Sequence, residues 1–379
     1  MLIPTVYAVG GPAILATFDL TYDRMGLLLG AGMLGYGGGA LIAGLLLDVV
    51  AIAPLARATM AVAAGACVAG GLAPAWGVLG VTMVLFGAAA GVLTVLPLVF
   101  FTDLYPADRT RVMARWQMFI SLAQVTFPLL IGFLLAAAAH GFGPDRGWRV
   151  LLLAGAPLFL VMLALVPGRS LGRRASIEPL RMRDLVAVLR RPLLLSILTI
   201  AMLHTAADNS TYLWIILMIK ERFHVGPQVL GVPGAAYSLA YVSGRLLRGT
   251  VRWPFGPLPT IAVGSLVGAA ILAGAVRAPT LAAVIALYAG AGLFFSLNWP
   301  STLGFAGERF PDRTGTVLGA ANAVTGPATM AVSALIGVVS RFSGSVELGM
   351  LLPVGLFFVL GIFAAVTHLR AQRPARGPQ

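Results

Sequence analysis

Charged side chains are scarce in this sequence, with only 13 acidic and 26 basic residues among 379, or 10% of the chain. There is a single cysteine, Cys67, and no polar stretch long enough to form a soluble domain. Soluble globular domains carry about 25% charged residues. The composition therefore excludes an ordinary soluble protein, and the lone cysteine excludes an intrachain disulfide.

The sequence also lacks the motifs of catalytic and cofactor-binding proteins. It contains no recognisable nucleophile–base pair, no cluster of metal-ligating residues and no glycine-rich phosphate loop. We therefore expect no enzymatic activity, no metal and no cofactor.

Apolar residues, in contrast, make up 59% of the chain, and the mean hydropathy is +0.94. A helix needs about 20 mostly apolar residues to cross a hydrocarbon core of ~30 Å. Since lipid offers no partner for the backbone, such runs must be helical. We predict an all-α membrane protein with twelve transmembrane helices, near residues 2–19, 26–48, 57–75, 78–102, 113–138, 149–167, 193–219, 227–250, 258–276, 280–305, 315–340 and 348–369.

The net charge of +13 could indicate nucleic-acid binding, but the positions of the basic residues favour another origin. With both termini in the cytoplasm, 19 of the 26 Lys and Arg residues lie on the cytoplasmic side, as the positive-inside rule predicts. We expect a multi-pass protein of the plasma membrane (the inner membrane in bacteria) that contacts lipid and no nucleic acid. The first run has no cationic region before it and is not a convincing signal peptide; either it begins at the membrane edge or a short tail precedes it.

The two halves of the chain resemble each other. Tyr105-Pro106-Ala107-Asp108-Arg109 has a counterpart in Phe310-Pro311-Asp312-Arg313, which begins 205 positions later. We predict two pseudo-symmetric six-helix halves, 1–167 and 193–369, a cytoplasmic linker 168–192 and a cytoplasmic tail 370–379. The linker is either a surface helix at anionic headgroups, since Met182, Leu185 and Leu189 recur at helical spacing, or a solvated connection. Duplicated halves often hold a binding site at the membrane midplane, where the repeats meet.

Gly44-Leu-Leu-Leu-Asp48 closes the glycine-rich second run and is echoed by Gly244-Arg-Leu-Leu-Arg248. This segment resembles the gating loop motif of the major facilitator superfamily, and the likeness extends over nearly the whole chain. Gly44 and Asp48 match the motif, whereas Val49 and Val50 stand where the family usually has a basic residue. The resemblance implies the major facilitator fold, alternating access, and a cavity lined by the first, fourth, seventh and tenth helices. We expect a monomer.

The seventh run contains the ionisable residues His204 and Asp208. An acid at the bilayer centre costs about 2.5–3.5 kcal/mol on insertion scales, so Asp208 should face a cavity or a partner. A spacing of four places both side chains on one helical face, where they could exchange a proton and couple transport to it. Alternatively, Asp208-Asn209-Ser210-Thr211 caps a break in this helix.

Polar and aromatic side chains of the expected cavity helices and their neighbours are candidates for binding a small-molecule solute. They are Gln117, Gln124, Asn209, Tyr212, Trp214, Tyr237, Tyr241, Asn298, Trp299 and Asn322. A purely structural role is the alternative for some of these residues. Pro300 would kink the tenth helix, and its polar neighbours would then stabilise the break. The isolated amides would hydrogen-bond between helices.

No Lys or Arg lies well inside an apolar run, which favours a neutral, sugar-like solute over an anion. The segment 294–302 loosely resembles the fucose and glucose proton-symporter branch of the superfamily, and this implies proton coupling. That branch also has a membrane acid in its first half, where this chain has none. One alternative is a drug or organic-cation antiporter with Asp208 as the partner of the cation, although Gln124-Val-Thr126-Phe127-Pro128 lacks the antiporter's glycine-rich motif. Another is a non-transporting membrane protein that binds a ligand or partner.

Overall fold

The computed structural model describes residues 2–47, 50–104, 109–166, 192–250, 255–310 and 314–372, and nearly all of them are helical. No β-strand occurs within these ranges. The helices are α1 (Leu2–Val9), α2 (Gly11–Thr17), α3 (Tyr22–Leu46), α4 (Ile52–Gly71), α5 (Trp76–Leu104), α6 (Arg109–Phe142), α7 (Pro144–Leu165), α9 (Pro192–Phe223), α10 (Pro227–Thr250), α11 (Pro257–Arg277), α12 (Leu281–Phe295), α13 (Asn298–Arg309), α14 (Thr314–Ser343), α15 (Val346–Gly349) and α16 (Leu351–Gln372).

Each of the twelve expected spans coincides with one of these helices or with two consecutive ones. Ten of the described spans are long and apolar enough to cross a bilayer, which confirms the all-α membrane fold class. The first expected span and α10 are not among the ten. The first consists of the short helices α1 and α2, and α10 carries Tyr237, Tyr241 and Arg245 among its apolar residues.

Breaks in two of the expected spans follow the local sequence. The first span is interrupted at Gly10, just ahead of Pro12. The tenth is interrupted at Ser296 and Leu297, shortly before Pro300, whose missing N–H disfavours an uninterrupted helix. In contrast, α9 is continuous from Pro192 to Phe223. The alternative that Asp208 and its polar neighbours cap a break in this helix is therefore wrong.

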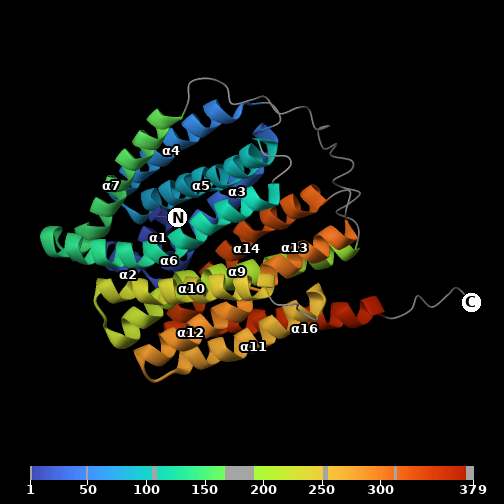
Figure 1. The fold of residues 1–379 in the computed structure, drawn as a ribbon. Coiled ribbons are helices and arrows are strands. Elements are labelled where there is room, and N and C mark those ends of the chain that lie inside the picture. The colour runs from blue at the N-terminus through green and yellow to red at the C-terminus, as the bar shows by residue number, and fades with distance from the viewer. Residues whose placement is uncertain are drawn as a thin grey trace, which may run out of the picture.

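The helices pack in two groups, α1–α7 and α9–α16, which follow the order of the chain (Figure 1). In the first group α3 packs against α5, and α4 against α7. In the second group α11 packs against α16 and α12, and α9 against α14. The groups meet mainly where α3 contacts α14 and where α6 contacts α10.

Glycines bring α3 and α5 into backbone contact within the first group. A Cβ added to Gly39 would overlap the backbone of Ala88, and one added to Gly35 would overlap that of Val84. A Cβ at Gly87 of α5 would in turn overlap the carbonyl of Gly32. Small residues of this kind allow membrane helices to associate through close van der Waals packing.

Close contact between the two groups extends from one end of the bundle, which we call the closed end, towards the helix middles. At this end Gly337 of α14 lies against Tyr22 of α3, and Arg341 forms a 3.0 Å ion pair with Asp23. Further along α3, a Cβ at Gly30 would come within 2.7 Å of the Met330 Cα. The closed end is therefore held by backbone-to-backbone contact.

A second contact, between α6 and α10, joins the groups on the other side. A Cβ at Gly231 would overlap the carbonyl of Pro128, and one at Gly132 would lie 3.1 Å from the Pro227 carbonyl oxygen. Since α10 begins and α6 ends in this region, the contact belongs to the same closed end.

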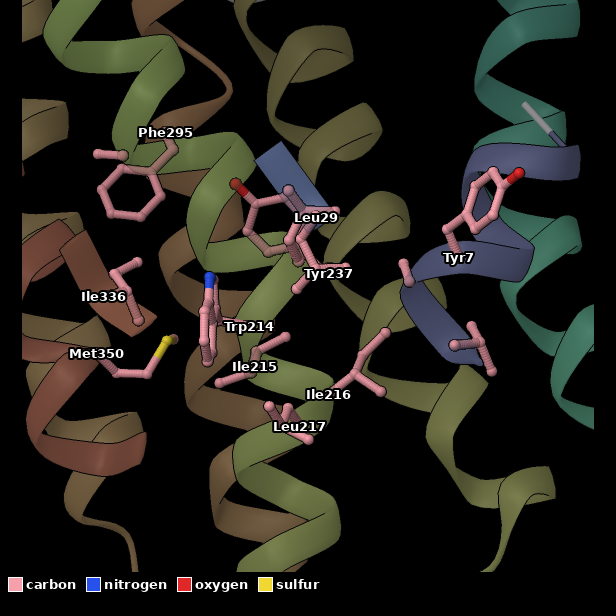
Figure 2. Packing of buried hydrophobic residues seen from close by; sticks show 14 of the residues in the cluster. Tyr7, Leu29, Trp214, Ile215, Ile216, Leu217, Tyr237, Phe295, Ile336 and Met350 are labelled. Atoms are coloured by element: carbon pink, nitrogen blue, oxygen red, sulfur yellow. The ribbon is translucent and has the colours of Figure 1, made fainter. Parts of the chain in front are cut away.

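Buried side chains of α9 form the centre of the hydrophobic core. Figure 2 shows Trp214 and Ile215 of α9 near Ile336 and Met350, with Tyr237 of α10 close by. Trp214 is fully buried, and its indole N–H donates to Ser333 Oγ of α14 at 2.9 Å. The half of α9 nearer the closed end is thereby connected to α14.

Several expectations lie outside the described residues. These are the linker 168–192 up to residue 191, most of the tail, Asp48 of the gating motif, and the repeated segments at 105–108 and 311–313. The expected domain boundaries, the orientation of the termini and the plasma-membrane location likewise stay predictions.

The glycine contact between α3 and α5 predicts a stability difference between adjacent positions. Gly39→Ala should destabilise the protein by about 1–3 kcal/mol, because the obstructing atoms are backbone and cannot move aside. Gly38→Ala is the matched control, since its Cβ would meet nothing within 4 Å. Thermal unfolding of both variants in the same detergent tests the prediction, and equal midpoints would contradict it.

Candidate functional site

Asp208 lies at the middle of α9 and is half-buried. The hydroxyl of Tyr237, on the neighbouring helix α10, donates a hydrogen bond to Asp208 Oδ1. An ionised carboxylate away from water depends on such donors, because its desolvation is otherwise uncompensated. The contact joins α9 and α10 at a charged group.

Four tyrosines from three helices surround this carboxylate. The ring of Tyr237 stacks on that of Tyr288 of α12, with centroids 4.5 Å apart. Tyr241 lies 5.7 Å and Tyr212 6.5 Å from Tyr237, between centroids. A Cβ at Gly292 of α12 would come within 2.7 Å of the Tyr237 ring, so glycine is needed for the ring to lie between α10 and α12.

Arg245 extends the cluster along α10. Tyr237, Tyr241 and Arg245 are spaced by four residues and share one helical face. The guanidinium carbon lies 4.6 Å from the centroid of the Tyr241 ring, a cation–π contact. Its positive charge acts on both Asp208 and His204. Arg245 is therefore part of the electrostatic site rather than a remote cation at a helix end.

His204 belongs to a different polar cluster, inside the second group of helices. Asn298 Nδ2 of α13 lies 3.4 Å from His204 Nδ1 and donates to Ser265 Oγ of α11 at 3.1 Å. His204 is 1% exposed and Asn298 is fully buried. His204 and Asp208, expected to act as a pair, thus engage separate partners on α13 and α10.

Hydrogen bonds hold the polar centre of α9 to α14. Ser210 Oγ donates to the Thr329 carbonyl, and Thr329 Oγ1 donates to the Thr205 carbonyl, each at 3.4 Å. Thr211 Oγ1 instead donates to the Ala207 carbonyl of its own helix. These bonds are made without any interruption of the helix.

The structure brings together only part of the predicted set. Tyr212, Tyr237 and Tyr241 gather around Asp208, with the half-buried Asn209 next to it in the chain. Asn298 and Trp214 are buried among helices of their own group. The others lie apart: Gln124 and Trp299 are half-buried, Asn322 and Gly44 are exposed, and Gln117 is on α6. Their assigned roles stay predictions.

A family model for the Major Facilitator Superfamily matches residues 2–326. This chain belongs to the major facilitator superfamily. It is therefore a multi-pass membrane transporter of a non-enzymatic family, with a small molecule as its substrate. No curated protein matches the chain by sequence.

Solved structures show the same fold over nearly the whole chain. A bacterial homolog of the human lysosomal transporter Spinster, inward-facing and unoccupied, superposes with a TM-score of 0.78 at 17% identity, covering 99% of this chain and 95% of the other. The nucleoside transporter NupG gives 0.78 at 13%, covering 96% of each chain. XylE from E. coli, a xylose transporter in an inward open conformation, gives 0.71 at 15%, covering 100% of this chain and 94% of XylE.

Three residues of the two polar clusters were not among the candidates from the sequence. They are Arg245, Tyr288 and Ser265. The spacing of Arg245 from Tyr237 and Tyr241 is a sequence signal that places it on their helical face, whereas no sequence pattern indicates that Ser265 meets Asn298.

Removing the hydroxyl from each of the two stacked tyrosines should change the stability of the protein differently. Tyr237→Phe removes the donor to Asp208 and should destabilise the protein by about 1–3 kcal/mol. Tyr288→Phe removes a buried hydroxyl that has no hydrogen-bond partner, so it should be neutral or stabilising.

Thermal unfolding of the two Phe variants measures this difference on rings of the same size. Equal shifts in the two variants would show that the Tyr237 hydroxyl contributes no more than a buried, unpaired hydroxyl.

Proposed function

We propose that this chain moves a small polar solute by alternating access and couples the movement to protons through Asp208. The observation that carries the proposal is the hydrogen bond from Tyr237 to a carboxylate at the middle of an unbroken membrane helix. Ionisable groups at this depth are costly and are usually functional. Asp208 can take up or release a proton while Tyr237 keeps it oriented.

The aromatic rings around Asp208 support binding of a solute with an apolar face. Tyr212, Tyr237 and Tyr241 offer ring surfaces together with hydroxyl groups, a combination that suits amphipathic molecules. The expectation of a neutral solute was based on the absence of a cation inside a span. Because the charge of Arg245 acts on Asp208, that argument for a neutral solute no longer holds. The same cation disfavours the organic-cation antiporter, because a positive solute at Asp208 would meet a like charge.

The contacts between the two helix groups support alternating access. With both termini in the cytoplasm, as expected, the closed end faces outward. The protein is then in an arrangement closed on its outward side. Glycine contacts, the Asp23–Arg341 ion pair and an electrostatic interaction between Tyr22 and Glu221 of α9 hold this end together. An exposed ion pair contributes only about 0–1 kcal/mol, so these contacts can separate when the transporter opens outward.

Neutralising Asp208 should separate proton coupling from solute movement. In proteoliposomes, Asp208→Asn should lose uptake driven by an inward proton gradient yet retain exchange of solute at equilibrium. A panel of sugars, nucleosides, carboxylates and lipophilic cations serves to find the solute. The control is Asp145→Asn, which changes an exposed acid in the first turn of α7. Proton-driven uptake that survives in Asp208→Asn would exclude the coupling role.

A wedge between α3 and α14 should prevent closure at the outward end. Gly30→Leu places a side chain where a Cβ alone would come within 2.7 Å of the Met330 Cα, so transport should stop while the protein still folds. Gly38→Leu, on the exposed side of the same helix, should transport normally. Solute uptake and size-exclusion profiles of both variants check this, and normal uptake by Gly30→Leu would contradict it.

A further inference from the structure

Arg245 is a half-buried cation that makes no direct ion pair with an acid in the part of the chain that the structure describes. Its described polar contact is with Tyr241, and its Nε is buried with no hydrogen-bond partner. Other arginines of the described residues do find acids: Arg222 pairs with Glu347, and Arg341 with Asp23. Within the described ranges, no carboxylate forms an ion pair with Arg245.

An unpaired guanidinium in this position requires a physical reason. Partial removal of a cation from water is unfavourable unless an anion or several acceptors compensate, and a tyrosine ring compensates only in part. Arg245 shares its helical face with Tyr237 and Tyr241, whereas the neighbouring Leu246 and Leu247 are the exposed side chains of this turn. The cation therefore faces the site of Asp208, and the exposed apolar surface of the helix lies elsewhere.

We propose that Arg245 binds an oxyanion, a carboxylate or phosphate group, carried by the transported solute, so that the cargo is a small organic acid. This assignment rests on the proposed transport function. A guanidinium presents several N–H donors in a planar fork that matches the two oxygens of such a group. Tyr241 holds the guanidinium in place, and the tyrosine rings lie beside the remainder of the solute.

When it is ionised, Asp208 disfavours binding of the same anion by charge repulsion. The charges of Arg245 and Asp208 act on each other within the site, so an ionised Asp208 offsets the cation and a protonated one leaves it available. The four tyrosines around Asp208, namely Tyr212, Tyr237, Tyr241 and Tyr288, are phenols that stay neutral near pH 7. Anion binding should therefore strengthen when Asp208 is neutral, which joins one proton to one acidic solute.

The oxyanion has two possible sources, a soluble acid or the phosphate of a lipid headgroup. Both present the same chemistry to Arg245. They differ in where the rest of the ligand lies. The remainder of a soluble acid would contact the tyrosine rings, whereas the remainder of a lipid would stay in the bilayer. The experiment therefore includes a separate arm for each source.

The test is a thermal-shift screen of the purified full chain with matched ligand pairs. Lactate is compared with lactamide, benzoate with benzamide, and glycerol phosphate with glycerol, and nanodiscs with and without anionic phospholipid form the lipid arm. A ligand that binds the folded state raises the unfolding temperature with its concentration. We expect a shift with at least one acid and none with its neutral counterpart.

Variants assign the binding to Arg245. Arg245→Gln should lower the affinity for the acid by about tenfold or more, since a charge-assisted hydrogen bond is lost, and Arg245→Lys should lower this affinity less. Asp208→Asn should strengthen binding of the same acid. Arg277→Gln, which removes an exposed arginine at the end of α11, should leave the affinity unchanged. Should Arg245→Gln not fold, the Lys and Asp208→Asn variants still give the expected pair of opposite shifts.

Three outcomes would overturn the assignment: no shift with any acid, an acid affinity unchanged in Arg245→Gln, or stabilisation by anionic lipid alone. Proton-driven uptake of a neutral solute that stops in Asp208→Asn and is unaffected by Arg245→Gln would also overturn it, while leaving the proposed function intact. Binding of an acid that depends on Arg245, in a protein whose uptake does not respond to protons, would instead remove the proton coupling and keep the assignment.

Discussion

The carboxylate of Asp208 and its hydrogen bond to Tyr237 are the constraint on which the site depends. A carboxylate at this depth needs a donor, and the donor comes from α10, so α9 and α10 must stay in register. Tyr237 is in turn held by its stack on Tyr288 and by the space left at Gly292. One polar contact thus determines the packing of three helices around the site.

The polar residues of α9 contact two separate sets of partners, although their spacing along the helix suggests a single set. His204, with Asn298 and Ser265, joins α9 to α13 and α11 inside one helix group, where all three side chains are buried. Asp208 joins α10 and the tyrosines. The first cluster connects three helices within the group α9–α16, and the second places a carboxylate at the contact between α9 and α10.

Glycine contacts divide in the same way. Those between α3 and α5 lie within one group, whereas those between α3 and α14 lie between the groups and, in the proposed transport cycle, separate when the closed end opens. A glycine in both places permits the same close approach. The difference between a permanent contact and a reversible one is set by which group each helix belongs to.

The sequence alone predicts the helical membrane class, the order of the spans, the break before Pro300 and the need of Asp208 for a partner. Apolar run length, proline chemistry and the cost of an intramembrane acid are local properties. The partners of those residues could not be predicted from the sequence. A spacing of four suggested that His204 and Asp208 act together, yet side chains on one helical face can meet different neighbouring helices. Only the tertiary structure separated them, brought Tyr237 to Asp208, and placed Arg245 within reach of the same charge, because these contacts depend on how α9, α10 and α13 pack against one another.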